Sequence, residues 1–497
     1  MKDNKKYYII IIAEYVPREV VLIIRDYLSE KFKNKDCTVL GFARSNKPLV
    51  EILLAAGASV TVRDKNTALE SDADYIRFSE MGAKFVLGES YLDSLSGDYI
   101  FRSPAFRPDI AEIKTAVEDR AILSSEMELF FEICPAKIIG ITGSDGKTTS
   151  TTLTHLLLDT ECKKRGRGKA YVGGNIGAPL LPLVFDMTKD DFAVVELSSF
   201  QLHTMSRSPS VAAITNLSPN HLDWHTGMDE YIDAKLNICR HEPIERLVTN
   251  AENAITREIA EKSELAITLF SSKADCFGNI VPAGKQNCRA IYECDGVICI
   301  DNGAEKKEIV AVSDILLPGR HNIENYMTAI ALTDGLVSCD TIREVATTFR
   351  GVAHRLELVR EKNGVKFYNS SIDSSPSRTA AALGALPKAP IVICGGYDKK
   401  IPFDTLAKSL CEKAKAVVLT GATAEKILAE IKACPDYDRE KLPVKHIPDF
   451  RDAVIVAADM AESGDIVLLS PACASFDHFK DFAARGEYFK EIVNGLK

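Results

Sequence analysis

The sequence has no excess of basic residues, since 61 Lys and Arg stand against 70 Asp and Glu, for a formal net charge of −9. A surface that binds nucleic acid needs a basic footprint to neutralise the phosphates. We therefore do not expect nucleic acid as a main partner. An anionic substrate would need basic side chains gathered locally in its binding site.

Long apolar runs are also missing. No run reaches the roughly 20 residues that a membrane-spanning helix requires. The nearest candidate, Tyr7–Ala13, is soon interrupted by Glu14 and Arg18 and is followed by no small-residue cleavage site. We interpret this segment as the start of a first strand or helix, and we expect no membrane partner.

The 13 cysteines form no paired Cys-x-x-Cys motif. Their number is odd and they are scattered along the chain, which indicates free thiols and is typical of a reducing cytoplasm. The one cluster comprises Cys276, Cys288, Cys294 and Cys299, and it lacks the spacing of a zinc site. We therefore expect a cytoplasmic protein.

The chain is long enough for several domains. Its 497 residues, 46% of them apolar, suggest roughly three domains of about 100–200 residues each. Strand-like and helix-like patterns alternate over much of the chain, which predicts an α/β fold. We place the domains at residues 1–126, of which 1–36 form an extension, at 127–352 and at 353–497.

Residues 137–153 read KIIGITGSDGKTTSTTL and predict a strand, a phosphate-binding loop and a helix. The loop comprises Gly143, Ser144, Asp145, Gly146, Lys147, Thr148 and Thr149. Glycines let backbone N–H groups surround phosphate oxygens, and the helix N-terminus adds partial positive charge. Lys147 would provide a cation for the outer phosphates, and Thr148 a hydroxyl for magnesium. Because Ile141 stands where the usual loop has its first glycine, a tight turn with Lys147 in solvent is the alternative.

Polar residues follow other predicted elements of the same region. Three glycines surround Asn175, so a backbone there could approach a ligand closely, although a plain turn is the alternative. Glu196 ends the apolar strand Phe192–Val195, and ligands bind at the carboxyl ends of parallel strands. We prefer a magnesium ligand to a helix cap for Glu196. His221 lies in a later polar loop, either near a ligand or as a structural histidine.

The predicted helix 228–239 carries a lysine on its apolar side. Positions 228, 231, 232, 235, 238 and 239 form one stripe at helical spacing, and Lys235 belongs to it. A buried ammonium is costly unless it is paired, and burial lowers its pKa. Lys235 is therefore either a snorkelling side chain or a lysine held for chemistry, as a neutral amine or as its carbon dioxide adduct.

An acidic residue ends the second predicted strand near the N-terminus. Thr38–Leu40 is a short strand, Gly41 opens a turn, and the strand Ser59–Val62 leads to Asp64. An acid about twenty residues after a glycine turn suggests a contact with a ribose or base. An ordinary residue at a strand end is an equal alternative for Asp64.

The last third of the chain again alternates strands and helices in a doubly wound pattern. Its predicted strands are Val365–Tyr368, Ile391–Cys394, Ala416–Leu419 and Ile466–Leu469. Each strand leads into a polar loop, so candidate binding residues again follow the strands.

Eight segments together resemble the Mur ligase family. From about Thr38 to the C-terminus they read TGSDGKTT, GGNIG, ELSSFQL, TNLSPNHLD, PGRHNIEN, HRLE, GGYDK and LSPACASFDHFKDFAARG. Their order and spacing carry the resemblance. The final segment is similar to that of the members that add D-glutamate, and the Asn-Pro-Arg motif expected of the members that add diaminopimelate or lysine is not found.

The resemblance implies an α/β fold of three domains: an N-terminal Rossmann-like domain for a uridine nucleotide, a central P-loop ATPase-like domain with a parallel or mixed sheet, and a C-terminal Rossmann-like domain for an amino acid. It implies ATP-dependent amide formation in peptidoglycan precursor synthesis. D-glutamate would be joined to UDP-N-acetylmuramoyl-L-alanine through an acyl phosphate, with two Mg²⁺ ions and ATP as co-substrate. We expect a cytoplasmic monomer with small-molecule partners only.

The resemblance also implies roles for single residues. Lys147, Glu196, His221 and Lys235 would be catalytic, and Thr148, Glu196 and a carbamylated Lys235 would hold magnesium. ATP would contact Gly143 to Thr149, Asn322 and Arg355. The muramoyl substrate would contact Asn175, Ser198, Gln201 and His221, with Asp64 at its nucleotide. D-glutamate would contact Lys399, Ser475 and Phe482.

Two positions depart from the family pattern. The family's Asn-Asp-Ser segment reads Asn369-Ser370-Ser371 here, and Asp373 is a candidate to compensate. Ile372 stands where some relatives have a lysine. An amide ligase with a different acceptor, similar to folylpolyglutamate synthase, is one alternative. A nucleotide-binding regulatory or scaffold protein is another.

Overall fold

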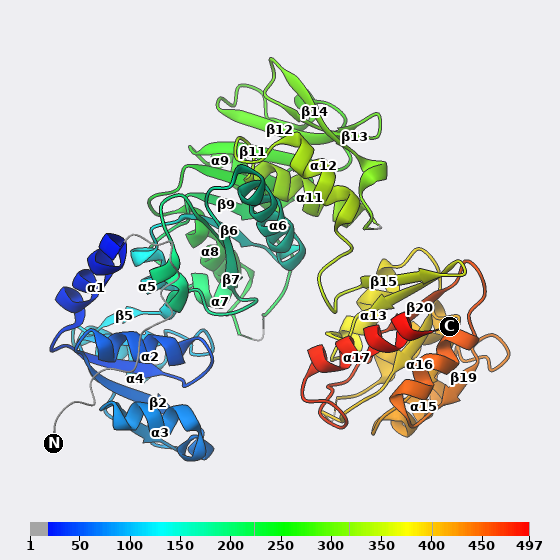
Figure 1. The fold of residues 1–497 in the computed structure, drawn as a ribbon, viewed down its shortest axis with the longest axis horizontal. Coiled ribbons are helices and arrows are strands. Elements are labelled where there is room, and N and C mark those ends of the chain that lie inside the picture. Colours follow the sequence, from blue (N-terminus) through cyan, green and yellow to red (C-terminus); the bar gives the residue numbers. More distant parts are fainter. Residues whose placement is uncertain (1–17, 223, 318, 400, 497) are drawn as a thin grey trace. The chain divides into compact units, whose positions relative to one another are not determined.

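The computed structural model describes residues 18–222, 224–317, 319–399 and 401–496 (Figure 1). They form two compact units, the first up to Val312 together with Ile323–Val345, the second comprising Ser313–Asn322 and the chain from Ala346 onward. Sheets of five and nine strands belong to the first unit and a six-stranded sheet to the second. The predicted α/β class is therefore confirmed. The strand or helix predicted at Tyr7–Ala13 lies outside the described residues.

The five-stranded sheet is parallel throughout, with strand order β3-β2-β1-β4-β5. Its strands are β1 Asp36–Leu40, β2 Ser59–Asp64, β3 Lys84–Leu87, β4 Tyr99–Arg102 and β5 Ile122–Ser124. The helices of this part are α1 Arg18–Phe32, α2 Asn46–Ala55, α3 Ala73–Glu80, α4 Ala111–Glu118 and α5 Glu126–Ile133, with a 3₁₀ turn at Thr67–Ser71. Helix α2 buries Leu49 and Leu53, one turn apart, so its apolar face lies on the core.

The nine-stranded sheet has the order β14-β13-β12-β11-β10-β9-β6-β8-β7. Its strands are β6 Lys137–Thr142, β7 Ala170–Gly174, β8 Phe192–Glu196, β9 Val211–Ile214, β10 Arg246–Asn250, β11 Ala266–Ser271, β12 Cys288–Cys294, β13 Val297–Asp301 and β14 Lys306–Ala311. Neighbours from β7 to β12 pair in parallel, whereas β12, β13 and β14 pair antiparallel. The loops after β6, β8 and β9 therefore leave one edge of the sheet side by side.

Helices lie between the strands of this sheet and after its last strand. They are α6 Lys147–Arg165, α7 Ser199–Leu202, α8 Met228–Leu236, α9 Ala254–Lys262, α10 Phe277–Ile280, α11 Arg320–Leu332 and α12 Cys339–Thr348. Short 3₁₀ helices lie at η2 Leu181–Asp186, Asn237–Cys239 and Val312–Asp314. Across the described residues, no helix combines the length and apolar character needed to cross a membrane.

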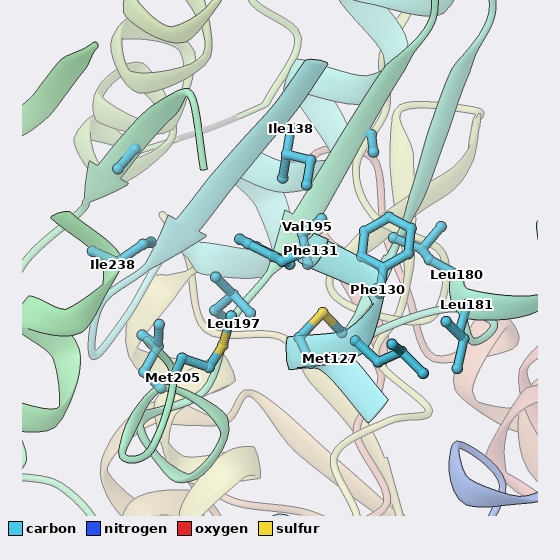
Figure 2. Packing of buried hydrophobic residues seen from close by; sticks show 14 of the residues in the cluster. Met127, Phe130, Phe131, Ile138, Leu180, Leu181, Val195, Leu197, Met205 and Ile238 are labelled. Atoms are coloured by element: carbon cyan, nitrogen blue, oxygen red, sulfur yellow. The ribbon is translucent and has the colours of Figure 1, made fainter. Parts of the chain in front are cut away.

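A shared core joins the two sheets of the first unit. One cluster of buried side chains extends from Ile24 in α1 to Tyr292 in β12. Figure 2 shows its centre, where Phe130 of α5 lies beside Leu180 and near Val195 of β8. Burying a side chain of this size contributes about 1.5–3 kcal/mol, so α5 and the neighbouring η2 hold the two sheets together.

The six-stranded sheet of the second unit has the order β15-β16-β20-β17-β18-β19, parallel except between β15 and β16. Its strands are β15 Glu357–Lys362, β16 Val365–Asn369, β17 Ile391–Cys394, β18 Ala416–Leu419, β19 Val444–His446 and β20 Ile466–Leu469. The helices are α13 Pro376–Ala385, α14 Asp404–Lys413, α15 Ala424–Ala433, α16 Phe450–Asp459 and α17 Phe482–Gly495. Separate apolar clusters cover its two faces, as a doubly wound sheet requires.

Candidate active site

The predicted strand, glycine loop and helix are β6, residues 143–146 and α6. Gly143 and Gly146 have φ angles of +147° and +77°. A Cβ on Gly143 would lie 1.9 Å from Thr215 Oγ1, and a Cβ on Gly146 would lie 2.5 Å from Asn325 Oδ1. Only glycine fits both positions. The loop leads into the 19-residue helix α6, whose N-terminal N–H groups favour an anion.

Side chains hold this loop in one shape. Lys147 Nζ donates hydrogen bonds to the carbonyl oxygens of Gly143 at 2.7 Å and of Ser144 at 2.8 Å. The hydroxyls of Ser144 and Tyr231 share a hydrogen bond of 2.9 Å, and the Asp145 N–H donates to Asn216 Oδ1 at 3.0 Å. Lys147 is half-buried, so the structure differs from the alternative in which it extends into solvent.

Lys235 lies inside the molecule with only 2% of its surface exposed. Its Nζ donates to Thr142 Oγ1 at 3.0 Å and to the Gly143 carbonyl oxygen at 2.9 Å. Burial lowers the pKa of Lys235 well below its usual value; the Lys147 ammonium lowers it further, and the Glu196 carboxylate partly opposes them. The inward orientation predicted from helical spacing is confirmed, and a neutral amine is favoured over a snorkelling ammonium.

Glu196 ends β8 and is 1% exposed. Its Oε1 accepts a hydrogen bond of 2.8 Å from Asn175 Nδ2, while its Oε2 has no hydrogen-bond partner. A buried carboxylate oxygen without a partner is unfavourable, and it suits a hard divalent cation. Gly174 allows the close approach of the two strands, because a Cβ there would lie 2.2 Å from the Glu196 carbonyl oxygen.

A cavity of about 320 Å³ opens beside Asn175. One wall is residues 43–46 at the N-terminus of α2, and another includes Asn175 and Gln201. Because Asn175 also bonds Glu196, the cavity adjoins the cluster of Lys147, Glu196 and Lys235.

Arg102 forms another part of the cavity wall. Its Nη2 donates to the Phe200 carbonyl oxygen at 2.7 Å and to Thr204 Oγ1 at 2.8 Å, so β4 is joined to α7 and the turn after it. Burial lowers the pKa of Arg102 to about 10, yet the guanidinium stays charged at neutral pH. Arg102 therefore gives the cavity a fixed positive charge, and none of these hydrogen bonds joins it to a carboxylate.

Other predicted contacts of this unit have local roles in the structure. Ser198 and Gln201 form a capping box at the N-terminus of α7. Asp64 lies at the end of β2, where its carboxylate accepts the N–H groups of Phe42 at 2.7 Å and Asn66 at 2.9 Å. The cavity wall is formed by the segment that follows Phe42, so the turn that Asp64 supports leads into the cavity.

His221 lies in the loop after β9 with a φ angle of +54°. Its ring packs against Phe200 of α7, with centroids 4.9 Å apart. The loops after β8 and β9 thus meet through these two rings. The ring contact brings His221 to α7, hydrogen bonds bring Lys147 and Lys235 to the glycine loop, and Glu196 bonds Asn175.

The second unit carries the remaining predicted residues at the carboxyl ends of its strands. Lys399 follows β17, with Nζ 3.5 Å from the Ser374 carbonyl oxygen, and Ser475 follows β20. Phe482 begins α17 and its ring lies 6.0 Å from that of His354. Arg355 follows His354, and Asn322 lies in α11.

The family comparisons agree with this arrangement. The model described as "Mur ligase middle domain" matches residues 141–333, and that described as "Mur ligase, glutamate ligase domain" matches residues 354–473. The UDP-N-acetylmuramoylalanine--D-glutamate ligase of Acetivibrio thermocellus is 47% identical over 472 residues, 94% of this chain and 98% of that protein. The chain belongs to the Mur ligase family.

Further Mur ligases are similar to it. The UDP-N-acetylmuramoylalanine--D-glutamate ligase of Clostridium novyi is 44% identical over 466 residues, 93% of this chain and 97% of that protein. Among solved structures, UDP-N-acetylmuramate-alanine ligase MurC from Thermotoga maritima has a TM-score of 0.51 at 18% identity, covering 93% of this chain and all of that one. MurF from Acinetobacter baumannii has the same TM-score and identity, covering 93% and 92%. These structures share the fold.

No sequence motif identified several residues that contribute to the site of this Mur ligase. Asn325 Oδ1 lies 3.2 Å from Ser150 Oγ and beside Gly146; its spacing of three from Asn322 on one helix was the available signal. Arg102 lies in no recognisable motif. Residues 43–46 follow the Gly41 turn. That turn suggested a ligand site nearby, but it did not indicate that these residues form the wall of the cavity.

In the second unit, the buried Arg485 of α17 was also missed. It donates to the carbonyl oxygens of Ser371 at 2.9 Å and Cys473 at 3.1 Å, so it joins the loops after β16 and β20. Burial lowers its pKa to about 10, which leaves it charged. A guanidinium at this position holds two loops of the Mur ligase that carry predicted ligand contacts.

Ser370 stands where the family pattern has an aspartate, and in the structure a nearby residue, Asp373, provides a carboxyl group. Asp373 is buried, and its Oδ2 accepts a hydrogen bond of 2.8 Å from Ser470 Oγ. Burial raises the pKa of Asp373, while hydrogen bonds from Ser370 and Ser470 and the nearby Arg355 charge oppose this. Ser370 and Asp373 therefore belong to one polar network near Arg355.

Proposed function

We propose that this Mur ligase joins D-glutamate to UDP-N-acetylmuramoyl-L-alanine with ATP as the energy source, in peptidoglycan precursor synthesis. Relatives of that name cover almost the whole chain at 44–47% identity. The single observation that carries the proposal is that Lys147 and Lys235 both bond the glycine loop, while Glu196 is close enough to act on the charge of Lys235. That arrangement suits activation of a carboxyl group by a nucleoside triphosphate.

The glycine loop binds the phosphates of ATP. Its N–H groups and the N-terminus of α6 surround the phosphate oxygens. When ATP binds, Lys147 Nζ leaves the carbonyl oxygens of the loop and contacts the outer phosphates. The alanyl carboxylate of the substrate attacks the γ-phosphorus, and ADP leaves with the electron pair of the broken P–O bond. Positioning and charge neutralisation account for most of the acceleration of such a transfer.

The acyl phosphate that results is attacked by the amine of D-glutamate. A tetrahedral intermediate forms at the acyl carbon, the amine loses a proton, and inorganic phosphate leaves as the C–O bond breaks. His221 lies near this carboxylate in the proposal. In the second unit, Lys399, Ser475 and Phe482 bind D-glutamate, and Asn322 and Arg355 contact ATP.

Thr148, Glu196 and a carbamylated Lys235 would hold two magnesium ions. The partnerless Oε2 of Glu196 supports this assignment. Bound magnesium neutralises phosphate charge and polarises the transferring group. Asn175 orients the Glu196 carboxylate through its 2.8 Å hydrogen bond. The neutral Lys235 amine adds to the carbon of carbon dioxide and releases one proton, which converts a buried amine into an oxygen ligand.

The cavity beside Asn175 takes the nucleotide-sugar portion of the substrate. Arg44, Arg102 and the N-terminus of α2 provide positive charge for two phosphates. Asn175 and Gln201 lie on the side that adjoins Glu196, so the acyl end reaches the cluster. We place the domains at residues 1–126, 127–352 and 353–497, and the enzyme acts as a monomer in the cytoplasm.

A phosphate-release assay tests the function. The enzyme is given ATP, magnesium, UDP-N-acetylmuramoyl-L-alanine and one amino acid at a time, including D-glutamate, L-glutamate, L-lysine and diaminopimelate. We expect release with D-glutamate only, and none after magnesium is removed with a chelator. Turnover with another amino acid would identify a ligase with a different acceptor, and no release at all would favour a regulatory protein.

A further inference from the structure

Glu126 is a buried acid in the wall of the 320 Å³ cavity. It is the first residue of α5 and only 6% of its surface is exposed. The backbone N–H of Leu181, at the start of η2, interacts with its carboxyl group. Its Oε1 atom is buried and has no hydrogen-bond partner. Figure 2 shows the next residue, Met127, and Leu181 within the surrounding apolar core.

The charged groups that share this cavity do not pair with Glu126. Arg102 directs its donors to the carbonyl oxygens of Phe106 and Phe200 and to Thr204. Arg44 is the other cation of the wall, α7 presents the neutral Gln201, and Glu128 of α5 accepts from Ser206.

Burial raises the pKa of Glu126 to about 7, and the Leu181 N–H opposes this only in part. No neighbouring cation contributes to that pKa. At neutral pH a large fraction of the carboxyl groups is therefore uncharged, and an uncharged carboxyl is a hydrogen-bond donor as well as an acceptor.

A purely structural role explains only half of this arrangement. The contact with Leu181 caps η2 through one oxygen, and that contact alone would be satisfied by an ionised carboxylate. It does not explain why the other oxygen, Oε1, is buried without a hydrogen-bond partner at a residue that lines the cavity, an arrangement that costs free energy.

We propose that Glu126 is a substrate-positioning residue whose neutral carboxyl group donates a hydrogen bond to an uncharged acceptor oxygen of the nucleotide sugar. This inference rests on the proposed function. A carboxylate at this position would repel a ligand that carries two phosphates, whereas the neutral acid both removes the repulsion and supplies a donor. Positive charge elsewhere in the cavity binds the phosphates, and Glu126 hydrogen-bonds a neutral group such as a sugar hydroxyl or an amide carbonyl.

Binding should then depend on the protonation of Glu126. Only the neutral form binds well, so the apparent Kd rises about 8-fold between pH 6.5 and pH 8 for a group with a pKa of about 7. Binding also takes up roughly three-quarters of a proton at pH 7.5, because the bound carboxyl is fully protonated. The phosphates of a nucleotide sugar do not change charge in this range.

The test is isothermal titration calorimetry of UDP-N-acetylmuramoyl-L-alanine into the full-length protein without ATP. Repeating the titration at pH 7.5 in buffers of different ionisation enthalpy measures the protons taken up. Wild type is compared with Glu126→Gln, which donates a hydrogen bond at every pH, with Glu126→Ala, and with Glu112→Gln, an exposed control on α4. Thermal melting verifies that each variant is folded.

We expect Glu126→Gln to bind as wild type does at pH 6.5, to keep that affinity at pH 8 and to lose the proton uptake. Glu126→Ala should bind about 10-fold more weakly at pH 6.5, and Glu112→Gln should match wild type. If wild type binds without proton uptake, or if Glu126→Gln retains the uptake, the inference is overturned. The proposed function still stands in that case, provided that phosphate release depends on D-glutamate. Wild type that neither binds the nucleotide sugar nor releases phosphate overturns both.

Discussion

Lys235 Nζ donates a hydrogen bond of 2.9 Å to the carbonyl oxygen of Gly143, which ties the core-facing helix α8 to the glycine loop. The same oxygen accepts a hydrogen bond of 2.7 Å from Lys147 Nζ. Two ammonium groups on one oxygen repel each other, and burial adds to the cost of charging Lys235. The pKa of Lys235 is therefore lowered well below its usual value, which favours a neutral amine next to the phosphate loop.

Lys235→Ala should lower kcat by about 100-fold or more, because an oxygen ligand next to the transferring phosphate is lost. Formate or acetate should restore part of the activity by replacing the carbamate. Carbon-13 NMR with labelled bicarbonate should detect a carbamate in wild type and not in the variant. Lys262→Ala, on an exposed side chain, is the control, and full activity of Lys235→Ala would refute the carbamate role.

Gly143→Ala should weaken ATP binding at least 10-fold and lower the free energy of unfolding by about 1–3 kcal/mol, because it forces a positive φ on a residue with a Cβ. That Cβ would lie 1.9 Å from Thr215 Oγ1. Nucleotide titrations and denaturant unfolding measure the two effects. Gly278→Ala is the matched control, since its Cβ would meet no atom within 4 Å. Normal ATP affinity in Gly143→Ala would contradict a phosphate-binding role for the loop.

Asp373→Ala should lower kcat/KM for ATP by about 10-fold, because it removes the carboxylate of the network near Arg355. Adding Ser370→Asp should restore part of the loss, since Ser370 and Asp373 lie in that network and a carboxylate at either position can serve it. Steady-state kinetics measure both variants, with the exposed Asp436→Ala as control. A double variant no better than the single one would show that Asp373 does not compensate for Ser370.

Glu161→Gln should destabilise the protein at neutral pH and much less in acid. Burial opposes ionisation of Glu161, but hydrogen bonds from Thr341 and Ser338 and from Arg165 outweigh it and lower the pKa to about 2. A carboxyl whose pKa falls on folding adds stability above its unfolded pKa, here about 4.5, and loses it as the pH falls toward 2. The contribution is at most about 3 kcal/mol.

Urea unfolding of wild type and Glu161→Gln at pH 7 and pH 3 measures this contribution. The difference in the free energy of unfolding should shrink at pH 3, whereas the exposed control Glu264→Gln should behave as wild type at both values. An equal difference at both values of pH would mean that the charge of Glu161 is not what stabilises the contact between α6 and α12.

Local features of the site could be predicted from the sequence because short stretches encode them. The glycine loop lies between β6 and α6 as its spacing indicated, and Lys235 faces the core as the helical period required. Strands β17, β18 and β20 have the predicted bounds because short apolar runs between turns define buried parallel strands.

The sequence by itself determined the α/β class, the phosphate loop and the inward lysine, since each depends on residues only a few positions apart. Tertiary structure alone decided which distant side chains meet. Arg102 reaches Phe200, Asn325 lies beside Gly146, and Glu126 enters a cavity wall formed by residues from α2 and α7. Such contacts follow from strand order and core packing, which no local periodicity specifies, because they depend on how whole elements bury their apolar faces against one another.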